Sequence, residues 1–246
     1  GLNYPLTETR VRQLGGSTAL WAGYCALFDP IDFDRRSWVS HSGWPFEAVE
    51  LTQYYSEAAR CLHVKDGCFD PDTFGASNEY VFSQLDNERY LPGIWRFGEW
   101  KADFAGENRV FLQQSRSVDV LINGCVTKIH LAENGESVSS LAVRTLAGTT
   151  GTIHAKHFIL AAGGLETPRL MLASRGRCIE GVGNFRDQVG RWFMEHPHVS
   201  IEGIEMVSNP ALAKWTEATS TVEGQKFTYC LGLRGDTQEQ LGVLNA

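Results

Sequence analysis

The most regular hydrophobic pattern in the chain is a short apolar run that ends at a pair of glycines. Residues 157–162 carry a Phe-Ile-Leu run without polar alternation, which is typical of a strand covered on both faces. Gly163 and Gly164 follow at once, and Thr167 next to Pro168 is a typical start of a helix. The pattern therefore predicts a buried strand, then a tight turn, then a helix that begins at Thr167.

This turn has two interpretations, and the pattern alone leaves both open. The end of a strand next to a helix N-terminus is where α/β sheets bind anionic or nucleotide ligands. Glycines let a backbone or a ligand approach closely, because no Cβ is in the way. The alternative is a tight turn between a strand and a helix that binds no ligand.

Apolar residues recur at helical spacing in one other long stretch. Residues 46–62 place apolar side chains three and four positions apart, directly after Pro45, which predicts a helix. The helix that begins at Thr167 is expected to end near Gly176. Residues 64–108 contain only short apolar stretches, so we expect an irregular and functional connection there.

Alternation of apolar and polar residues predicts several strands and a β-meander. The predicted strands cover residues 118–131, 138–145, 152–156, 199–204 and 227–233. The Asn-Gly pair at 134–135 predicts a hairpin turn, and residues 148–151 form the next turn. We therefore expect an α/β chain, α+β overall, in which antiparallel strands lead into the buried strand.

Composition limits the class of partner. The 246 residues carry a formal net charge of −7, which argues against nucleic acid as the main partner. Hydrophobic residues make up 43% of the chain, enough for a sizeable core, and no apolar run is long enough to span a membrane. The six cysteines lack a Cys-x-x-Cys pair and the histidines lack clustered spacing, so no metal site is expected. We expect a soluble protein, with the cytoplasm as the favoured location.

A second glycine-containing stretch changes the picture. Residues 10–23 contain two arginines followed by Gly15, Gly16, Ser17 and Thr18. The two hydroxyl groups can donate hydrogen bonds to phosphate or ribityl oxygens. A loop of this composition suits a backbone that wraps closely around a flat cofactor.

Four segments, in the same order, resemble the glucose–methanol–choline (GMC) family of FAD-dependent oxidoreductases, in its bacterial sugar and alcohol dehydrogenase branch. They are the loop at 14–23, the stretch 32–55 with its Ser-Gly-Trp-Pro, the pair 126–129 and 161–168, and the Val-Gly-Arg to Met-Glu-His-Pro stretch at 189–197. The family's Gly-x-Gly-x-x-Gly turn and its C-terminal segment with the catalytic His have no counterpart here. The chain is therefore expected to be the middle portion of a larger flavoprotein.

The resemblance implies part of a Rossmann-like FAD-binding domain with a β-meander, and part of an antiparallel-sheet substrate domain. Residues 1–62 would hold the flavin loop and the following helix, and 63–108 a lid or substrate-side excursion. Residues 109–190 would continue the FAD-binding domain, and 191–246 would begin the substrate domain.

The resemblance also implies cofactor-binding residues on both glycine-containing stretches and on one strand. They are Gly15, Gly16, Ser17, Thr18, Trp21, Ala22, Val126, Ala162, Gly163 and Thr167. Trp21 and Ala22 would lie at the isoalloxazine edge, and the backbone of Val126 would bracket the adenine. Plain core packing is an equally good interpretation of Val126 and Ala162.

Two further positions bear on the chemistry. Leu20 stands where some relatives carry a His that bonds covalently to the flavin, so FAD is expected to bind non-covalently. His196, in the Glu-His-Pro stretch, is the catalytic candidate within the chain, but the His of that motif is more often structural. The catalytic group is therefore left unassigned.

The implied reaction is oxidation of a CH–OH group of a sugar, polyol or other alcohol, with hydride passing to flavin N5. The expected partners are the small alcohol or sugar and the remainder of the same flavoprotein. One alternative is a non-catalytic, flavin-free fragment or subunit that retains the fold. Another is an NAD-dependent α/β dehydrogenase, against which the missing Gly-x-Gly-x-x-Gly turn counts heavily.

Overall fold

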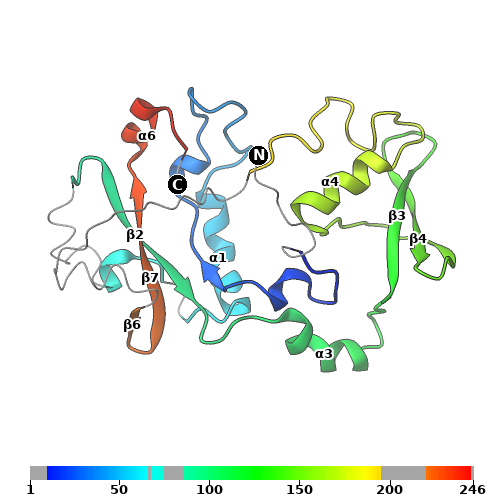
Figure 1. Cartoon of the computed structure of the whole chain (residues 1–246), viewed down its shortest axis with the longest axis horizontal. Coiled ribbons are helices and arrows are strands. Elements are labelled where there is room, and N and C mark those ends of the chain that lie inside the picture. The colour runs from blue at the N-terminus through cyan, green and yellow to red at the C-terminus, as the bar shows by residue number, and fades with distance from the viewer. Residues whose placement is uncertain (1–9, 66–67, 75–85, 195–219, 245–246) are drawn as a thin grey trace, which may run out of the picture. The chain divides into compact units, whose positions relative to one another are not determined.

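The computed structural model describes residues 10–65, 68–74, 86–194 and 220–244, and it contains helices and antiparallel sheets (Figure 1). The chain divides into two compact units. Residues 1–114 and 205–246 make up the first unit, and residues 115–204 make up the second. The expected mixed α/β class is confirmed.

The first unit is built on a four-stranded antiparallel sheet of order β1-β2-β7-β6. Its strands are β1 (Tyr24–Cys25), β2 (Tyr90–Phe97), β6 (Ser220–Val222) and β7 (Gln225–Leu233). Glu223 and Gly224, between β6 and β7, both have positive φ, as a tight two-residue hairpin turn requires. β7 confirms the strand predicted at 227–233.

Three α-helices and three short 3-10 turns complete the described part of the first unit. They are η1 (Gly16–Ala19), η2 (Pro30–Asp32), α1 (Val49–Cys61), η3 (Pro71–Phe74), α3 (Phe104–Gln114) and α6 (Gly235–Leu241). α1 confirms the helix predicted at 46–62, although it begins three residues later. α3 and α6 were not predicted.

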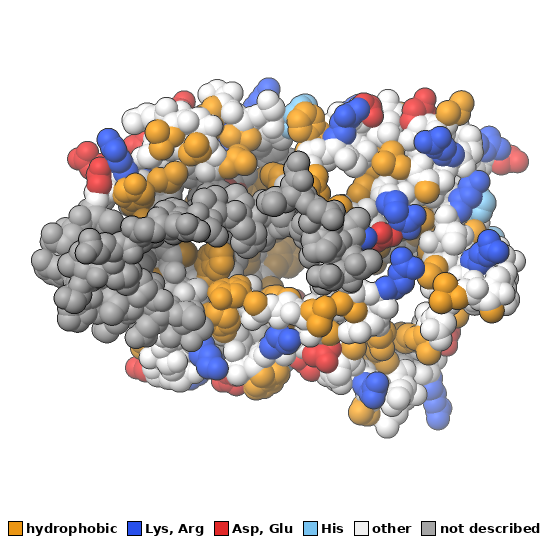
Figure 2. Space-filling model, in the orientation of Figure 1, with side chains coloured by type: hydrophobic (Ala, Val, Ile, Leu, Met, Phe, Trp, Pro, Cys, Tyr) orange, Lys and Arg blue, Asp and Glu red, His pale blue; other side chains and the backbone are white. Residues whose placement is uncertain are grey.

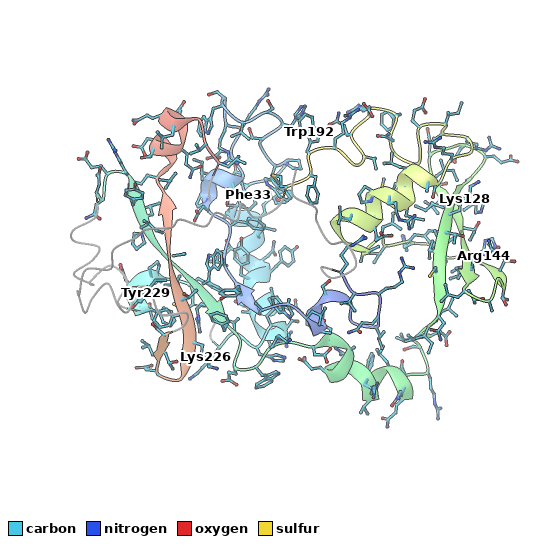
Figure 3. The ribbon with its side chains drawn as sticks, in the orientation of Figure 1. Phe33, Lys128, Arg144, Trp192, Lys226 and Tyr229 are labelled. Carbon is cyan, nitrogen blue, oxygen red and sulfur yellow. The ribbon has the colours of Figure 1, made fainter. Side chains whose placement is uncertain are left out.

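Two small clusters of buried side chains form the core of the first unit. One contains Phe74, Ile94 and Phe227, and the other contains Cys25, Ala59 and Val64. Tyr229, labelled on β7 in Figure 3, packs against the first cluster and donates its hydroxyl proton to the Phe74 carbonyl at 3.3 Å. Trp21 packs against the second cluster, so residues of the glycine-containing loop are anchored in the core.

The prediction that residues 64–108 are irregular is wrong, because this stretch contains β2 and the start of α3. Pro92 and Gly93 lie inside β2, and the sequence pattern did not predict this strand because both residues usually weaken one. β1 pairs with β2 only at Arg96 and Phe97, so Pro92 has a strand neighbour on one side alone among the described residues. At Gly93 a Cβ would lie 2.6 Å from Cys230 Sγ on β7, so a larger residue would force that side chain to move.

The second unit is a three-stranded antiparallel meander with one helix packed on it. Its strands are β3 (Gly124–Leu131), β4 (Val138–Thr145) and β5 (Thr150–Ile153), and its helix is α4 (Gly163–Ala173). The meander and its turn at Gly135, which has φ +73°, are confirmed. Its third strand differs from the predicted 152–156, because β5 begins at Thr150, inside the predicted turn, and ends at Ile153. β3 is shorter than the predicted 118–131, because Asn123 adopts a left-handed conformation that interrupts the strand.

The buried strand predicted at 157–162 is not found. Ile159 is 89% exposed, and no strand among the described residues pairs with this segment. The local sequence still has the apolar character of a strand, but a strand needs a neighbour to bond its backbone groups. The strand predicted at 199–204 lies outside the described residues.

The helix predicted from Thr167 begins four residues earlier, at Gly163. Gly163 turns the chain with a φ of +86°, and Thr167 lies inside the helix instead of capping it. Thr167 Oγ1 accepts a hydrogen bond from the Ala162 N–H at 3.2 Å, so the side chain satisfies a backbone donor just outside the first turn. At the other end the helix stops at Ala173, before the predicted Gly176.

Apolar side chains are exposed on the described surface, as the orange atoms in Figure 2 show. They include Leu146, Ile159 and Met194, which are 99%, 89% and 80% exposed. None of the described helices combines the length and the apolar content that a bilayer crossing needs.

Candidate functional site

The glycine-containing loop of the first unit folds into a tight turn. Gly15 and Gly16 have φ values of +83° and +57°, a conformation that side chains other than glycine adopt at a cost. The Gly16 N–H donates to the Gln13 carbonyl at 3.0 Å. The N–H groups of Leu20 and Trp21 both donate to the Ser17 carbonyl at 2.9 Å, which closes η1. The loop is therefore a defined structure of the chain.

Residues 101–107, which precede and begin α3, hold this loop through contacts that are distant in sequence. Trp21 Nε1–H donates to the Ala102 carbonyl at 3.0 Å, and Lys101 Nζ donates to the Ala19 carbonyl at 3.1 Å. Gly15 packs so tightly on α3 that a Cβ there would lie 2.7 Å from Ala105 Cβ. We call residues 101–107 the support segment; sequence reasoning did not identify them.

Of the four central loop residues at 15–18, two contact the rest of the chain and two are open to a ligand. Thr18 Oγ1 donates to the Gly15 carbonyl at 2.7 Å and accepts from the Phe104 N–H at 3.4 Å, so this hydroxyl serves the loop itself. Gly15 faces α3. In contrast, Ser17 is exposed, and no described atom lies within 4 Å of where a Cβ of Gly16 would be. Gly16 and Ser17 are the two positions that a ligand can approach directly.

A cavity of about 170 Å³ borders the end of the loop. Trp21, Ala22 and Gly23 form part of its wall. The other lining residues come from the 97–102 stretch, from Leu62 at the end of α1, and from Lys226 on β7, labelled in Figure 3. The predicted residues Trp21 and Ala22 thus face a hollow on the surface of the first unit.

A carboxylate–imidazole pair joins the support segment to the end of α1. Glu107 Oε2 is 2.9 Å from His63 Nε2, and Glu107 Oε1 accepts the Asp103 N–H at 2.9 Å. The Asp103 backbone hydrogen bond, with a smaller contribution from His63, lowers the pKa of Glu107 below its usual value. The sequence does signal the start of α3, because Asp103 stands directly before Phe104 and Glu107 lies in the first turn. The contact of Glu107 with His63 depends on tertiary structure.

Three of the four predicted site residues of the second unit, Ala162, Gly163 and Thr167, lie at the start of α4. No described atom lies within 4 Å of where a Cβ of Gly163 or of Gly164 would be, so the backbone is open there. Such an open helix N-terminus offers N–H groups and a partial positive charge to an anionic ligand. Ala162 is exposed, which removes the core-packing interpretation for this residue.

A serine at the far end of α4 ties the helix to the meander. Ser174, only 2% exposed, accepts a hydrogen bond from the Ile129 N–H at 2.9 Å and donates to the Leu170 carbonyl at 2.6 Å. These two bonds connect α4 with β3. The position of the α4 N-terminus within its unit therefore depends on this buried hydroxyl.

Val126 lies on β3, which is an edge strand among the described residues. It pairs with Val143 of β4 and is half-buried. An edge backbone is what bracketing a ring by N–H and C=O groups needs, although packing beside Val143 of β4 also explains a valine here. The adenine role of Val126 stays a prediction.

The predicted site residues fall into two sets, one in each unit. Their joint action on one cofactor therefore stays a prediction, as does the division of the chain into four functional segments. His196 lies outside the described residues. Within the described ranges, His, Cys, Asp and Glu side chains form no group of three that could hold a metal ion.

Taken unit by unit, the chemistry of the described residues is compatible with a dinucleotide such as FAD. Open backbone at Gly16 and at Gly163 would admit a cofactor, and the exposed Ser17 hydroxyl is a hydrogen-bond donor. The α4 N-terminus suits a phosphate. Thr18 and Thr167 fit less directly, because their hydroxyl groups already bond to the chain's own backbone.

Comparison with known proteins bears on the family. The sequence profile of the GMC oxidoreductase family matches residues 3–198. The chain is 26% identical over 239 residues to 2-methyl-1,2-propanediol dehydrogenase of Mycolicibacterium austroafricanum, a match that covers 79% of this chain and 43% of the relative. It is 24% identical over 242 residues to paromamine 6'-oxidase of Streptomyces fradiae, covering 82% of this chain and 44% of the relative.

A shorter match reaches higher identity. Over 48 residues the chain is 46% identical to the fructose dehydrogenase large subunit of Gluconobacter japonicus, covering 19% of this chain and 9% of that protein. The chain thus spans less than half the length of the curated relatives it matches. GMC oxidoreductases are generally FAD-dependent, and the resemblance seen in the four sequence segments is confirmed. The extent of the profile match, which covers most of the sequence, shows that this chain belongs to the GMC oxidoreductase family.

Proposed function

We propose that this chain binds FAD non-covalently and contributes to the oxidation of a CH–OH group of a sugar, polyol or other alcohol. The observation that carries the proposal is the open, positive-φ backbone at Gly16 and Gly163, within a chain that belongs to a generally FAD-dependent family. Two relatives are named for a diol and for fructose, and both names describe dehydrogenases.

The chain's own residues would bind and orient the cofactor. Bound FAD supplies a hydride acceptor for the alcohol carbon. Gly16 and Ser17 would contact it from the first unit. The first turn of α4, beginning at Gly163, would donate N–H groups to a phosphate from the second unit. Leu20 has no nucleophilic atom and is 62% exposed, which supports non-covalent binding.

A flavin titration tests this proposal. The purified protein is mixed with FAD, and binding is followed by the flavin absorbance bands and by equilibrium dialysis. Anaerobic addition of a diol or a sugar then tests whether the bound flavin loses its colour. Binding is expected, and bleaching is expected once the group that takes the alcohol proton is also present, since no such group is assigned in this chain. A colourless protein that ignores excess FAD contradicts the proposal and favours the flavin-free alternative, whereas binding of NAD alone favours a nicotinamide enzyme.

Two glycines of the second unit provide a matched pair for the same titration. Gly163 and Gly135 have similar φ values, +86° and +73°, and both have open space where a Cβ would be. Replacing either by Ala costs about 1–2 kcal/mol of backbone strain. Gly163→Ala is expected to weaken FAD binding about tenfold or more, because its Cβ enters the ligand space. Gly135→Ala, in a hairpin turn, is expected to leave FAD affinity unchanged.

A further inference from the structure

The flavin loop owes its shape to the support segment, residues 101–107, as much as to its own glycines. Three hydrogen bonds and one close packing contact join them, at Ala19, Trp21, Thr18 and Gly15. All four contacts bridge more than 80 positions of sequence. Any residue that fixes the support segment therefore also acts on the loop.

Glu107 is the side chain that fixes the support segment. Its Oε1 atom accepts the Asp103 N–H at 2.9 Å, and Asp103 Oδ1 in turn accepts the Ala105 N–H at 3.2 Å. Its backbone N–H donates to the Asp103 carbonyl at 2.9 Å. Ala105 and Phe104, the two α3 residues that touch the loop, lie inside this closed set of bonds.

The second carboxylate oxygen of Glu107 reaches a histidine that is itself held in place. His63 adopts φ +58° directly after α1, and its N–H donates to the Arg60 carbonyl at 3.2 Å. Its carbonyl accepts the Glu99 N–H at 2.9 Å, and its ring lies 4.3 Å from the Trp100 ring at an angle of 32°. His63 is therefore a fixed anchor, and Glu107 links that anchor to the start of α3.

We propose that Glu107 is a positioning residue for the flavin loop, holding α3 against Gly15 and Thr18 through Asp103 and against α1 through His63. The consequence of this role, tighter FAD binding, rests on the proposed function. Its structural part concerns the chain without FAD and is tested separately. Glu107 itself is not placed in contact with the cofactor or the substrate.

Hydrogen–deuterium exchange of the FAD-free protein tests the structural part. Glu107→Ala is expected to speed exchange of the amides at 15–21 about tenfold, because the charged hydrogen bonds that hold α3 are lost. Glu107→Gln keeps an oxygen for the Asp103 N–H and is expected to restore most of the protection. The control is Glu57→Ala, which removes an exposed carboxylate paired with Arg60 at 3.2 Å on α1. Exchange at 15–21 should stay unchanged in that variant.

A double-mutant cycle on the FAD dissociation constant tests the consequence. Glu107→Ala alone and Thr18→Val alone should each weaken FAD binding about tenfold. The double variant should raise the FAD dissociation constant by much less than the product of the two single increases, because both substitutions act through the same contact. Glu107→Ala combined with Gly163→Ala in the other unit should be multiplicative.

The outcomes separate the two proposals. If the unaltered protein binds no FAD, the proposed function falls, and the role of Glu107 in cofactor binding falls with it. If it binds FAD but Glu107→Ala leaves both exchange at 15–21 and FAD affinity unchanged, only this inference is overturned. Uniformly faster exchange throughout the first unit, without rescue by Glu107→Gln, would show a general stabilising role and also overturn it.

Discussion

Gly15 and Gly16 offer a direct test of the way the loop at 14–23 packs. Both residues have positive φ, so replacement by Ala costs each about 1–2 kcal/mol of backbone strain. At Gly16 a Cβ meets nothing within 4 Å among the described residues. At Gly15 it would lie 2.7 Å from Ala105 Cβ and 2.9 Å from Ala105 N, which are far below normal contact distances. The two variants therefore differ only in the clash with α3.

The magnitude of that clash follows from what it meets. Ala105 N belongs to the helix backbone, so no side-chain rotation can relieve the contact. Overpacking of this kind typically costs a further 1–3 kcal/mol or so. Gly15→Ala should therefore lower the free energy of unfolding by about 2–5 kcal/mol, against about 1–2 kcal/mol for Gly16→Ala.

Urea denaturation of the FAD-free protein measures this difference, since it reads the free energy of unfolding for each variant. FAD titration of the same samples should show weaker FAD binding in both variants. Gly16→Ala should weaken it although its cost in stability is the smaller one, because Gly16 is the glycine with open space in front of it. Equal destabilisation by the two variants would refute the packing of Gly15 on α3.

Three further predictions concern other parts of the chain. Ser174→Ala should destabilise the second unit by about 1–3 kcal/mol, because it leaves the buried Ile129 N–H without its acceptor. Ser139→Ala, at an exposed position of β4, should cost under about 1 kcal/mol in the same urea titration. Burial raises the pKa of the Cys230 thiol from 9.0 to about 11, so the stability that this thiol contributes is present below pH 9 and is lost as the pH rises toward 11. Cys230→Ala should remove this pH dependence of the free energy of unfolding between pH 9 and 11. A thiol reagent at neutral pH should label exposed Cys61 well before Cys230. Acid precipitation of the FAD complex should release all flavin into the supernatant, because Leu20 offers no atom for a covalent bond, and flavin retained in the pellet would contradict non-covalent binding.

Local sequence patterns predict the second unit better than the first. The predicted strand 138–145 coincides with β4, because alternation and the Asn-Gly turn are both local signals. β2 was missed, since Pro92 and Gly93 are explained only by pairing with β7, more than 130 positions away. The strand predicted at 157–162 is wrong although its composition suits a strand, because no described segment pairs with it.

In the candidate site, too, local features were predicted from the sequence and tertiary contacts were not. Glycines 15, 16 and 163 were identified from the sequence, and each has the positive φ that favours a glycine. The hydroxyl of Thr18 was expected to face a ligand but bonds within the chain, because Gly15 and Phe104 lie closer to it than any sequence pattern indicates. No sequence pattern predicts the support segment, since its contacts to the loop depend on tertiary structure.

Hydrogen–deuterium exchange with and without FAD tests the central claim most directly. The claim is that the loop at 14–23 and the turn at 161–167 bind the same dinucleotide. The account predicts that saturating FAD slows amide exchange in both peptides together, with the same dependence on FAD concentration. Protection of one peptide alone, or of neither, would contradict it.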